Sequence, residues 1–530
     1  MASEGPAPGP TSAASSLRWP LVALLGVALA GLGGGAYVIG SSLGASGPGL
    51  VGGNDPVNAG AKDRRVLEAN NSPTMVRNPR EPDHLAIANR IDTPSFGCAL
   101  HVSRDAGATW NGTPIPFPAG EELPPRCFAP EPAFGADGTL YLSFVTLKGS
   151  GNSPNAVWFS LSMDGGRTLS TPTRVSGPLA YQVRLAADHE TPGRLYLTWL
   201  QARATATYAF PDTGNPITVT RSDDGGTTWG PPVRISSPTR QRVVAPAPAI
   251  GPRGEVYVLF LDLGNDSLDY HGAHEGIGGE PYPGPWTLVL ARSFDNGVTW
   301  QEAVVEEVIV PTERVIVFFP PLPSLAVDQR SGRLFASFAD ARLGDPDVWV
   351  WTSGDAGATF NAASRVNDTP IGDGTSQYLS KLAVTPNGRV DVLYYDRRSD
   401  PMNVMNEVSL QSSFDGAKTF KPRLRLSDRQ FDSRIGFGRE RNLPDLGSRL
   451  ALVSDERRSL AVWTDTRGGS EAANKQDLAR QVIAFSSSPA IRGPLRIAGL
   501  IGLTAAALVF SSLWVWVRQR RAENSPRLNP

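Results

Sequence analysis

Residues 222–229 read SDDGGTTW, and the 530-residue chain contains six copies of this kind of polar turn. The other copies are SRDAGATW (103–110), SMDGGRTL (162–169), SFDNGVTW (293–300), SGDAGATF (353–360) and SFDGAKTF (413–420). Aspartate always occupies the third position, and the six aspartates are Asp105, Asp164, Asp224, Asp295, Asp355 and Asp415. Successive copies lie about 60 residues apart, with one longer step between the third and the fourth. This period predicts a repeat architecture.

An alternating apolar run precedes each of the six polar turns, usually opening with glycine, and a seventh run has no polar turn after it. The runs are DHLAIANR (83–90), GTLYLSFV (138–145), GRLYLTWL (193–200), GEVYVLFL (254–261), GRLFASFA (332–339), GRVDVLYY (388–395) and RSLAVWTD (458–465). Alternation with period two, bounded by turn residues, indicates short strands. Four strands in each of seven repeats predict an all-β, seven-bladed β-propeller. A six-bladed ring with one accessory unit is the alternative.

The two ends of such a ring have to pair, because an open ring leaves a free sheet edge. After QVIAFSSS (481–488) an outer strand is still missing, and RVLEANN (65–71) resembles outer strands such as RVSGP (174–178). We therefore expect Arg65–Asn70 to complete the last blade. Residues 63–490 are then the propeller, and the Gly-rich residues 41–62 are a linker.

The composition of the polar turn indicates a folding role. An aspartate in a turn accepts hydrogen bonds from the backbone N–H groups that follow it. Glycine permits a positive φ, and the final aromatic residue can pack beneath the turn. We expect all six aspartates to be structural. In the last copy Ala417 replaces the glycine, so we expect a looser turn there.

The pattern S-x-D-x-G-x-T-W resembles the Asp box, or bacterial neuraminidase repeat, of the sialidase superfamily. The resemblance covers roughly residues 70–490 and implies a β-propeller. If the boxes join the third and fourth strands, the loops between second and third strands lie on the opposite face. Variable loops on a rigid scaffold are where binding groups collect, so we expect function on that face.

A second motif recurs at the end of three second strands: FADAR (338–342), YYDRR (394–398) and WTDTR (463–467). It places an aspartate and an arginine at equivalent positions, namely Asp340, Asp396 and Asp465 with Arg342, Arg398 and Arg467. One interpretation is a repeated ion pair that fastens loops between blades. The other is a polar binding mouth, because the arginine fork suits a carboxylate or phosphate.

The sialidase resemblance also implies catalytic candidates. Sialidases use three arginines for the sialic acid carboxylate, an aspartate acid/base, and a tyrosine nucleophile assisted by glutamate. The segment FADARLGDPD (338–347) matches their arginine-then-acid segment through Arg342 and either Asp345 or Asp347. Tyr395, with its neighbour Tyr394, is the candidate nucleophile.

The arginine-isoleucine-proline element that sialidases carry is split in this chain. The strand before the 338–347 segment, VIVFFPPLPS (315–324), contains no such arginine. Repeat one instead contains Arg77-Asn78-Pro79, followed by Arg90 and Asp92. The two parts of the sialidase pattern therefore fall in different blades.

The longest insertion, residues 261–286, is rich in acidic, histidine and aromatic residues. His271, His274 and Glu275 are candidate ligands for a divalent metal. Tyr270, Tyr282 and Trp286 are candidates for an aromatic platform under a sugar ring. A solvated loop is the third alternative, and no cofactor is otherwise expected.

Two uncharged segments flank the predicted propeller. Residues 21–40 predict a transmembrane anchor or a cleaved signal peptide, and 495–517 predict a transmembrane helix, since about 20 apolar residues span a bilayer. Basic residues follow the second segment, so 518–530 is expected to be a cytoplasmic tail. Residues 1–20 form the other cytoplasmic tail if 21–40 is uncleaved. The propeller is then extracytoplasmic at the cell membrane.

The two cysteines indicate the compartment, and the charge balance indicates which partners to expect. Cys98 and Cys127 are a disulfide candidate in an oxidising compartment. Acidic and basic residues nearly cancel, at 51 against 50, which argues against a nucleic-acid partner. We expect a membrane-anchored module that binds an extracellular glycan or protein. The alternative is an exo-sialidase or related glycoside hydrolase acting on acidic sugars.

Overall fold

The computed structural model describes residues 27–28, 48–63, 65–204, 214–266, 282–312, 322–436, 445–470, 473–485 and 492–523. The chain divides into two units. One comprises Leu50–Ala484, and the other combines Met1–Gly49 with Phe485–Pro530. Helix α3 (Arg492–Glu523) belongs to the second unit and contains the predicted segment 495–517. Segment 21–40 lies outside the described residues except for Val27 and Ala28. Within the described part of the chain, no helix has both the length and the apolar character that a membrane crossing requires.

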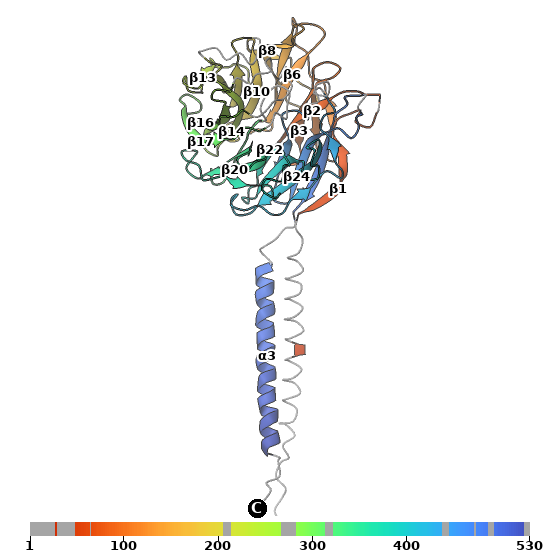
Figure 1. Cartoon of the computed structure of the whole chain (residues 1–530), viewed down its shortest axis with the longest axis vertical. Helices are drawn as coiled ribbons and strands as arrows, with labels where there is room; N and C mark the ends of the chain where they lie inside the picture. The colour runs from red at the N-terminus through yellow and green to blue at the C-terminus, as the bar shows by residue number, and fades with distance from the viewer. Residues whose placement is uncertain are drawn as a thin grey trace, which may run out of the picture. The chain divides into compact units, whose positions relative to one another are not determined.

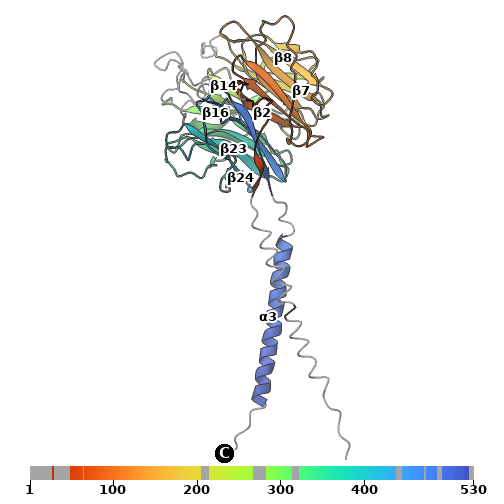
Figure 2. The ribbon, with the colours of Figure 1, turned by 90° about the vertical axis from the view of Figure 1, so that its right-hand side faces the viewer.

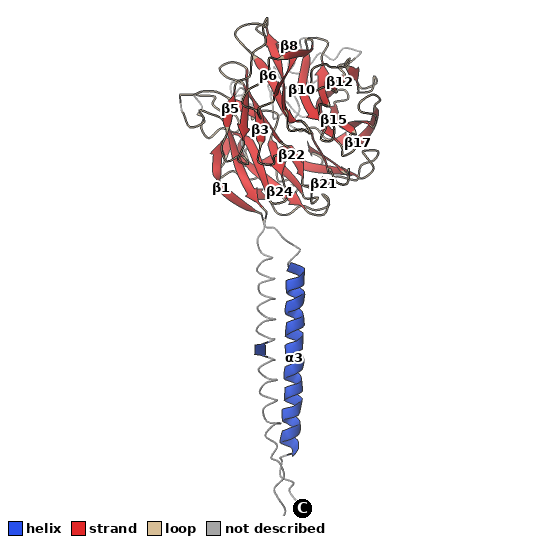
Figure 3. Cartoon of the chain, turned by 180° about the vertical axis from the view of Figure 1, so that it is seen from behind, coloured by secondary structure: helices blue, strands red, loops and turns tan. Residues whose placement is uncertain are grey.

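Seven antiparallel sheets make up the first unit, arranged as a ring (Figures 1 and 3). Blade 1 contains β2 (Asn70–Arg77), β3 (Leu85–Ile91), β4 (Gly97–Ser103) and β5 (Asn111–Thr113), and blade 2 contains β6 (Cys127–Phe134), β7 (Leu140–Lys148), β8 (Ser153–Ser162) and β9 (Thr173–Ser176). Blade 3 contains β10 (Ala180–Ala187), β11 (Leu195–Gln201), β12 (Ile217–Ser222) and β13 (Val233–Arg234), and blade 4 contains β14 (Val243–Ile250), β15 (Val256–Asp262), β16 (Trp286–Ser293) and β17 (Gln301–Ile309).

The remaining blades follow the same order from the inner to the outer strand. Blade 5 contains β18 (Ser324–Val327), β19 (Leu334–Asp340), β20 (Asp347–Ser353) and β21 (Ser364–Arg365). Blade 6 contains β22 (Gln377–Val384), β23 (Val390–Asp396), β24 (Met405–Ser413) and β25 (Leu424–Arg425), and the short β26 (Phe431–Asp432) also pairs with β24. Blade 7 contains β27 (Ala451–Ser454), β28 (Arg458–Asp465), β29 (Asp477–Ala484) and β1 (Gly49–Pro56). The prediction of seven blades is confirmed.

Ring closure uses a different segment from the one predicted. The outer strand of blade 7 is β1, whereas Arg65–Asn70 was expected there, and β1 falls inside the expected linker 41–62. In Figure 2 the early β1 and the late strands lie together in the lower part of the ring. Asn54 of β1 donates hydrogen bonds to Leu426 O (2.9 Å) and Gln481 Oε1 (2.8 Å). Because β1 is mostly exposed, it lacks the apolar alternation by which a strand is recognised.

This closure also explains why seven blades carry six boxes. In blades 1–6 the box turn connects the third strand to the outer strand of the same blade. In blade 7 the outer strand comes from the other end of the chain, and the sequence after β29 contains no seventh box. Apolar side chains of the first and last blades, including Leu85, Ile87, Leu460 and Val462, share one buried cluster that seals the junction.

The boxes share one hydrogen-bond pattern. In the third box Ser222 Oγ donates to Asp224 Oδ1 (2.8 Å), and Thr228 donates to Asp224 through its backbone N (2.9 Å) and Oγ1 (2.6 Å). The expected loosening of the sixth box is wrong, because Ala417 N reaches Ser413 Oγ at 2.9 Å, the same distance as from Gly226 N to Ser222 Oγ. Ala417 adopts φ 65° and thereby keeps the turn. The boxes are structural turns.

Acid should weaken these turns. Hydrogen bonds from the box threonines lower the pKa of Asp224, Asp295 and Asp355 to about 2. An unfolded aspartate has a pKa of about 3.9, so the stabilisation is fully present above that value and is lost as the pH falls toward 2. We expect the urea midpoint to drop between pH 5 and pH 2, and Asp295→Asn to reduce that drop. An identical pH dependence in the variant would contradict this assignment.

A disulfide joins Cys98 of β4 to Cys127 of β6, with a Cα–Cα distance of 5.7 Å. It links blades 1 and 2 across a sequence separation of 29 residues. A cross-link closing a loop of this size typically contributes roughly 3 kcal/mol. We expect the double variant Cys98→Ser/Cys127→Ser to lose about that much unfolding free energy in urea titrations. Added reductant should destabilise the wild type and leave the double variant unchanged.

Candidate functional site

The inner strands of five blades carry a bulge at the same place. The bulge residues Ser72, Ala129, Gln182, Ala245 and Leu379 all have a positive φ, and the pairing register shifts at each of them. The residue two positions later is Thr74 in β2, Glu131 in β6, Arg184 in β10, Ala247 in β14 and Lys381 in β22. The repeated bulge therefore sets one side chain from each of these blades at an equivalent level of the ring.

Four of these side chains, together with Arg449, form a polar group that we call the axial cluster: Thr74, Glu131, Arg184, Lys381 and Arg449. Glu131 lies at its centre, with 4% of its side chain exposed. Its carboxylate pairs with Arg184 Nη2 at 3.0 Å and with Arg449 Nη1 at 2.5 Å. Thr74 Oγ1 donates to Glu131 at 3.0 Å and accepts from Arg449 Nη1 at 3.0 Å. Residues from blades 1, 2, 3, 6 and 7 thus meet at one place.

The axial cluster has more positive than negative charge. Three cationic side chains surround one carboxylate, and burial lowers the pKa of Lys381 to about 8, with the charges of Arg184 and Arg449 acting in the same direction. Burial likewise lowers the pKa of Arg449 to about 10, an effect that Glu131 opposes. Arg184 Nε and Nη1 and Arg449 Nε are buried and have no hydrogen-bond partner among the described residues. These N–H groups can donate hydrogen bonds to an anionic group.

A pair of acidic groups adjoins the cluster. Arg90 Nη2 donates to Asp92 Oδ2 (2.7 Å), and Asn71 donates to the same oxygen (2.7 Å). Burial, reinforced by the negative charge of Asp92, raises the pKa of Asp445 to about 6. The positive charge of Arg90 also contributes to the lowered pKa of Arg449, which places the two groups within electrostatic reach. A buried carboxyl whose pKa is raised toward the operating pH is able to act as a general acid.

The residues of the recurring Asp-x-Arg motif form ion pairs between neighbouring blades. Arg342 Nη2 contacts Asp340 Oδ2 (2.6 Å) and Glu306 Oε2 of β17 (3.0 Å). Arg398 pairs with Asp396 (2.7 Å) and with Asp368 (2.6 Å), which follows the outer strand of blade 5. Arg467 likewise pairs with Asp465 and with Asp428, which follows the outer strand of blade 6. Asp340, Asp396 and Asp465 are buried. The geometry is that of inter-blade ion pairs.

The catalytic candidates do not converge. Asp347 Oδ1 accepts hydrogen bonds from Arg365 Nη2 (2.6 Å) and Asn367 Nδ2 (2.6 Å). Asp345 accepts from Gly374 N (2.8 Å), and burial together with Asp347 and Asp373 raises its pKa. Tyr395 is fully buried, and its hydroxyl contacts the backbone O (3.2 Å) and N (3.1 Å) of Thr464. The tyrosine therefore has no face open to a substrate.

The long insertion contributes little to the described site. Tyr270, His271, His274 and Glu275 lie outside the described residues. Trp286 is 4% exposed, and its Nε1 donates to Asp266 Oδ2 at 3.0 Å. Tyr282 packs against the same buried cluster as Trp286. Trp286 is therefore a packing residue, and Tyr282 is partly buried against the same cluster. Within the described ranges no group of three His, Cys, Asp or Glu residues could hold a metal ion.

Sequence reasoning missed the axial cluster, although a signal is present. Inner strands CFAPEPAF, AYQVRLAA and QYLSKLAV each carry one charged residue at the fifth position of an otherwise uncharged strand. Charged residues are rarely buried unless they are paired. A charged residue at the same position of several inner strands therefore indicates side chains that meet inside the ring.

Closed pairing of seven blades and six hydrogen-bonded boxes define this protein as an Asp-box β-propeller. Its fold is a seven-bladed β-propeller, as the box resemblance implied. No protein-family model matches the chain.

Similarity to known proteins is low at the level of sequence. A curated relative, a xyloglucanase from Paenibacillus sp, is 25% identical over 274 residues, which cover 43% of this chain. The match spans 26% of the xyloglucanase, so about a quarter of that protein is represented.

Three solved structures illustrate the range of similar folds. Phage phi92 endosialidase has a TM-score of 0.47 at 9% identity, with 83% of this chain and 70% of that chain covered. A Fusarium graminearum alpha-L-arabinofuranosidase has a TM-score of 0.41 at 14% identity, covering 69% and 98%. The Hadza microbial sialidase Hz136 has a TM-score of 0.38 at 13% identity, covering 75% and 73%. Likeness at this level concerns the fold and not the activity.

Proposed function

We propose that the propeller is a binding module that takes a carboxylate-bearing glycan at the axial cluster. The observation that carries the proposal is the excess of cationic side chains, the half-buried Arg184 and Lys381 and the buried Arg449, around the single carboxylate of Glu131. Buried charges are stable when they are paired and hydrogen-bonded. A ligand carboxylate would supply the missing countercharge.

The arrangement of donors supports a planar anion. Arginine presents several N–H groups in a rigid fork that matches a carboxylate. Arg184 retains two unpartnered nitrogens and Arg449 one among the described residues, so both can donate to a further oxygen while still bonded to Glu131. The curated relative is named for a glycan substrate, which favours a glycan over a protein as the ligand. For this chain we propose glycan binding without catalysis.

The cellular setting of the module rests on the sequence. The uncharged segments 21–40 and 495–517 support an anchor at the cell membrane, and the basic tail 518–530 supports a cytoplasmic C-terminus. The propeller would then face the outside of the cell, where acidic glycans and oxidised cysteines are both common.

Binding can be tested with a matched pair of sugars. We expect the full-length protein to bind sialyllactose in preference to lactose in calorimetric titrations. Arg184→Met should weaken sialyllactose binding by about tenfold or more, because hydrogen bonds to charged groups contribute about 1.5–3 kcal/mol. Arg104→Met, at an exposed arginine paired with Glu81, is the control and should leave binding unchanged. Equal affinity for the two sugars would overturn the proposal.

Hydrolysis of an acidic sugar is the second candidate function. It is favoured by Asp445, because burial and the neighbouring Asp92 raise the pKa of this carboxyl to about 6, and a general acid needs a pKa near the operating pH. A fluorogenic sialoside tests hydrolysis directly. If the protein is a hydrolase, the wild type should release the fluorophore and Asp445→Asn should not. Binding of sialyllactose without turnover would leave the binding module as the function.

A further inference from the structure

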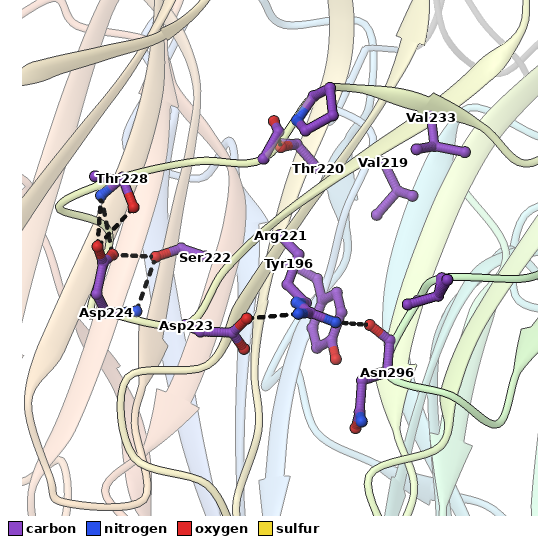
Figure 4. Close-up of a pocket in the computed structure, with 14 residues that line it drawn as sticks. Tyr196, Val219, Thr220, Arg221, Ser222, Asp223, Asp224, Thr228, Val233 and Asn296 are labelled. Carbon is purple, nitrogen blue, oxygen red and sulfur yellow. Dashed lines mark hydrogen bonds and ion pairs between the residues drawn. The ribbon is translucent and has the colours of Figure 1, made fainter.

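A pocket lies between the third and fourth Asp boxes. It has a volume of about 440 Å³ and is lined by strands and turns of blades 3 and 4 (Figure 4). We call it the inter-box pocket and define it by Tyr196, Arg221, Asp223, Val233, Asn296 and Val298. None of these residues belongs to the axial cluster.

The two acids of SDDGGTTW have separate tasks here. Asp224 faces Ser222 and Thr228 and holds the turn, while Asp223 faces Arg221 in the pocket (Figure 4). Among the six boxes, only the third has a carboxylate at the second position, where the others carry Arg104, Met163, Phe294, Gly354 and Phe414. The folding of the box therefore does not require Asp223.

The fourth box departs from the pattern on the opposite wall. Asn296 occupies a position that is alanine or glycine in every other box. Val298 occupies a position that holds Ala108, Arg167, Thr227, Ala358 or Lys418 elsewhere, and it is 65% exposed. Three side chains that the turns do not need thus line one pocket from two neighbouring blades.

The polar side of the pocket is fixed and charge-balanced. Asp223 pairs with Arg221 Nη2 at 2.6 Å and with Arg194 Nε at 2.8 Å. Arg194 Nη1 donates to Asn296 Oδ1 (2.8 Å), and Arg221 Nη1 donates to Asn296 O (2.7 Å). Asp224 offsets the remaining positive charge. Because the charges cancel, the pocket has little net attraction for an ion, which distinguishes it from the axial cluster.

The remaining walls are apolar, with one unsatisfied polar group. Val219, Val233, Pro231 and Val298 contribute aliphatic surface. Tyr196 is fully buried against the pocket, and its hydroxyl has no hydrogen-bond partner among the described residues. A buried hydroxyl without a partner costs about 1–3 kcal/mol.

We propose that the inter-box pocket is a second binding site, specific for an uncharged saccharide. A sugar ring presents aliphatic C–H groups on its faces and hydroxyl groups around its edge. Its faces fit the valine and proline wall, and its hydroxyls fit the fixed carboxylate, guanidinium and amide groups of Asp223, Arg221 and Asn296. Pockets that are mostly apolar with a few fixed polar groups are the general form of small-molecule sites. The protein would then contact glycans at two separate sites.

The test uses neutral sugars and substitutions that the box already tolerates. Saturation-transfer NMR and titrations would be run on the full-length protein with cellobiose, maltose and lactose. Val298→Lys places a charge in the pocket, and Lys418 at the same position of the sixth box shows that the turn accommodates lysine. The matched control is Ala358→Lys in the fifth box. Asn296→Ala, which copies Ala106 and Ala356, removes only the amide.

The expected result is binding of at least one of these sugars, weakened about tenfold or more by Val298→Lys and unaffected by Ala358→Lys. Arg184→Met should also leave it unchanged, which separates this site from the axial cluster. Failure of all three sugars to bind would overturn the proposal. Equal binding by the wild type and Val298→Lys would also overturn the proposal. The paired side chains of Asp223, Arg221 and Asn296 would then serve only to fasten blade 3 to blade 4.

Discussion

Replacing Glu131 with alanine is expected to lower the free energy of unfolding by about 3–5 kcal/mol. The carboxylate is buried and is held by Arg184, Arg449 and Thr74. Its removal leaves the cationic side chains of the axial cluster without a countercharge, and an uncompensated buried charge is strongly destabilising. Urea unfolding of the full-length protein at neutral pH measures the loss.

Glu81→Ala is the matched control for this experiment. Glu81 also pairs with an arginine at 3.0 Å, but its side chain is 60% exposed. Exposed ion pairs contribute about 0–1 kcal/mol, so the control should change little. If Glu131→Ala were as mild as Glu81→Ala, the cations of the cluster would have to be solvated, and the binding proposal would lose its main support.

Replacing Arg389 with methionine is the second change with a large expected effect, again about 3–5 kcal/mol. Arg389 has 2% of its side chain exposed and pairs with Asp391 at 3.0 Å. It also donates to Asp455 O (2.8 Å) and to Ser459 Oγ (3.1 Å), which ties blade 6 to blade 7. Without the arginine, Asp391 becomes a buried carboxylate whose remaining partners are serine hydroxyls.

The double variant Arg389→Met/Asp391→Leu distinguishes a charge effect from lost packing. Replacing both partners of a buried pair by apolar residues is often neutral or stabilising, so the double variant should recover most of the stability. Arg330→Met removes an exposed inter-blade bond to Pro386 O (2.9 Å) and should be nearly silent. A double variant as unstable as Arg389→Met would show that the arginine acts through packing instead.

The boxes show how much of the structure a repeated sequence pattern can predict. Each box is a local structure in which Ser222, Asp224 and Thr228, or their equivalents, lie within seven consecutive residues. Local hydrogen bonds leave a sequence pattern, and the pattern was therefore sufficient for the fold, the number of blades and the structural role of the six aspartates. The same reasoning failed for β1, because an outer strand exposed on both faces has no apolar alternation to detect.

The sequence by itself determined the propeller, since its period and its turns are properties of neighbouring residues. The tertiary structure alone decided which polar side chains meet. Thr74, Glu131, Arg184, Lys381 and Arg449 are spread over five blades and converge because the ring closes and the inner strands bulge at equivalent places. Asp223 and Asn296 likewise meet only because blades 3 and 4 pack side by side. Contacts between distant residues depend on closure of the ring, and closure has no local sequence signal.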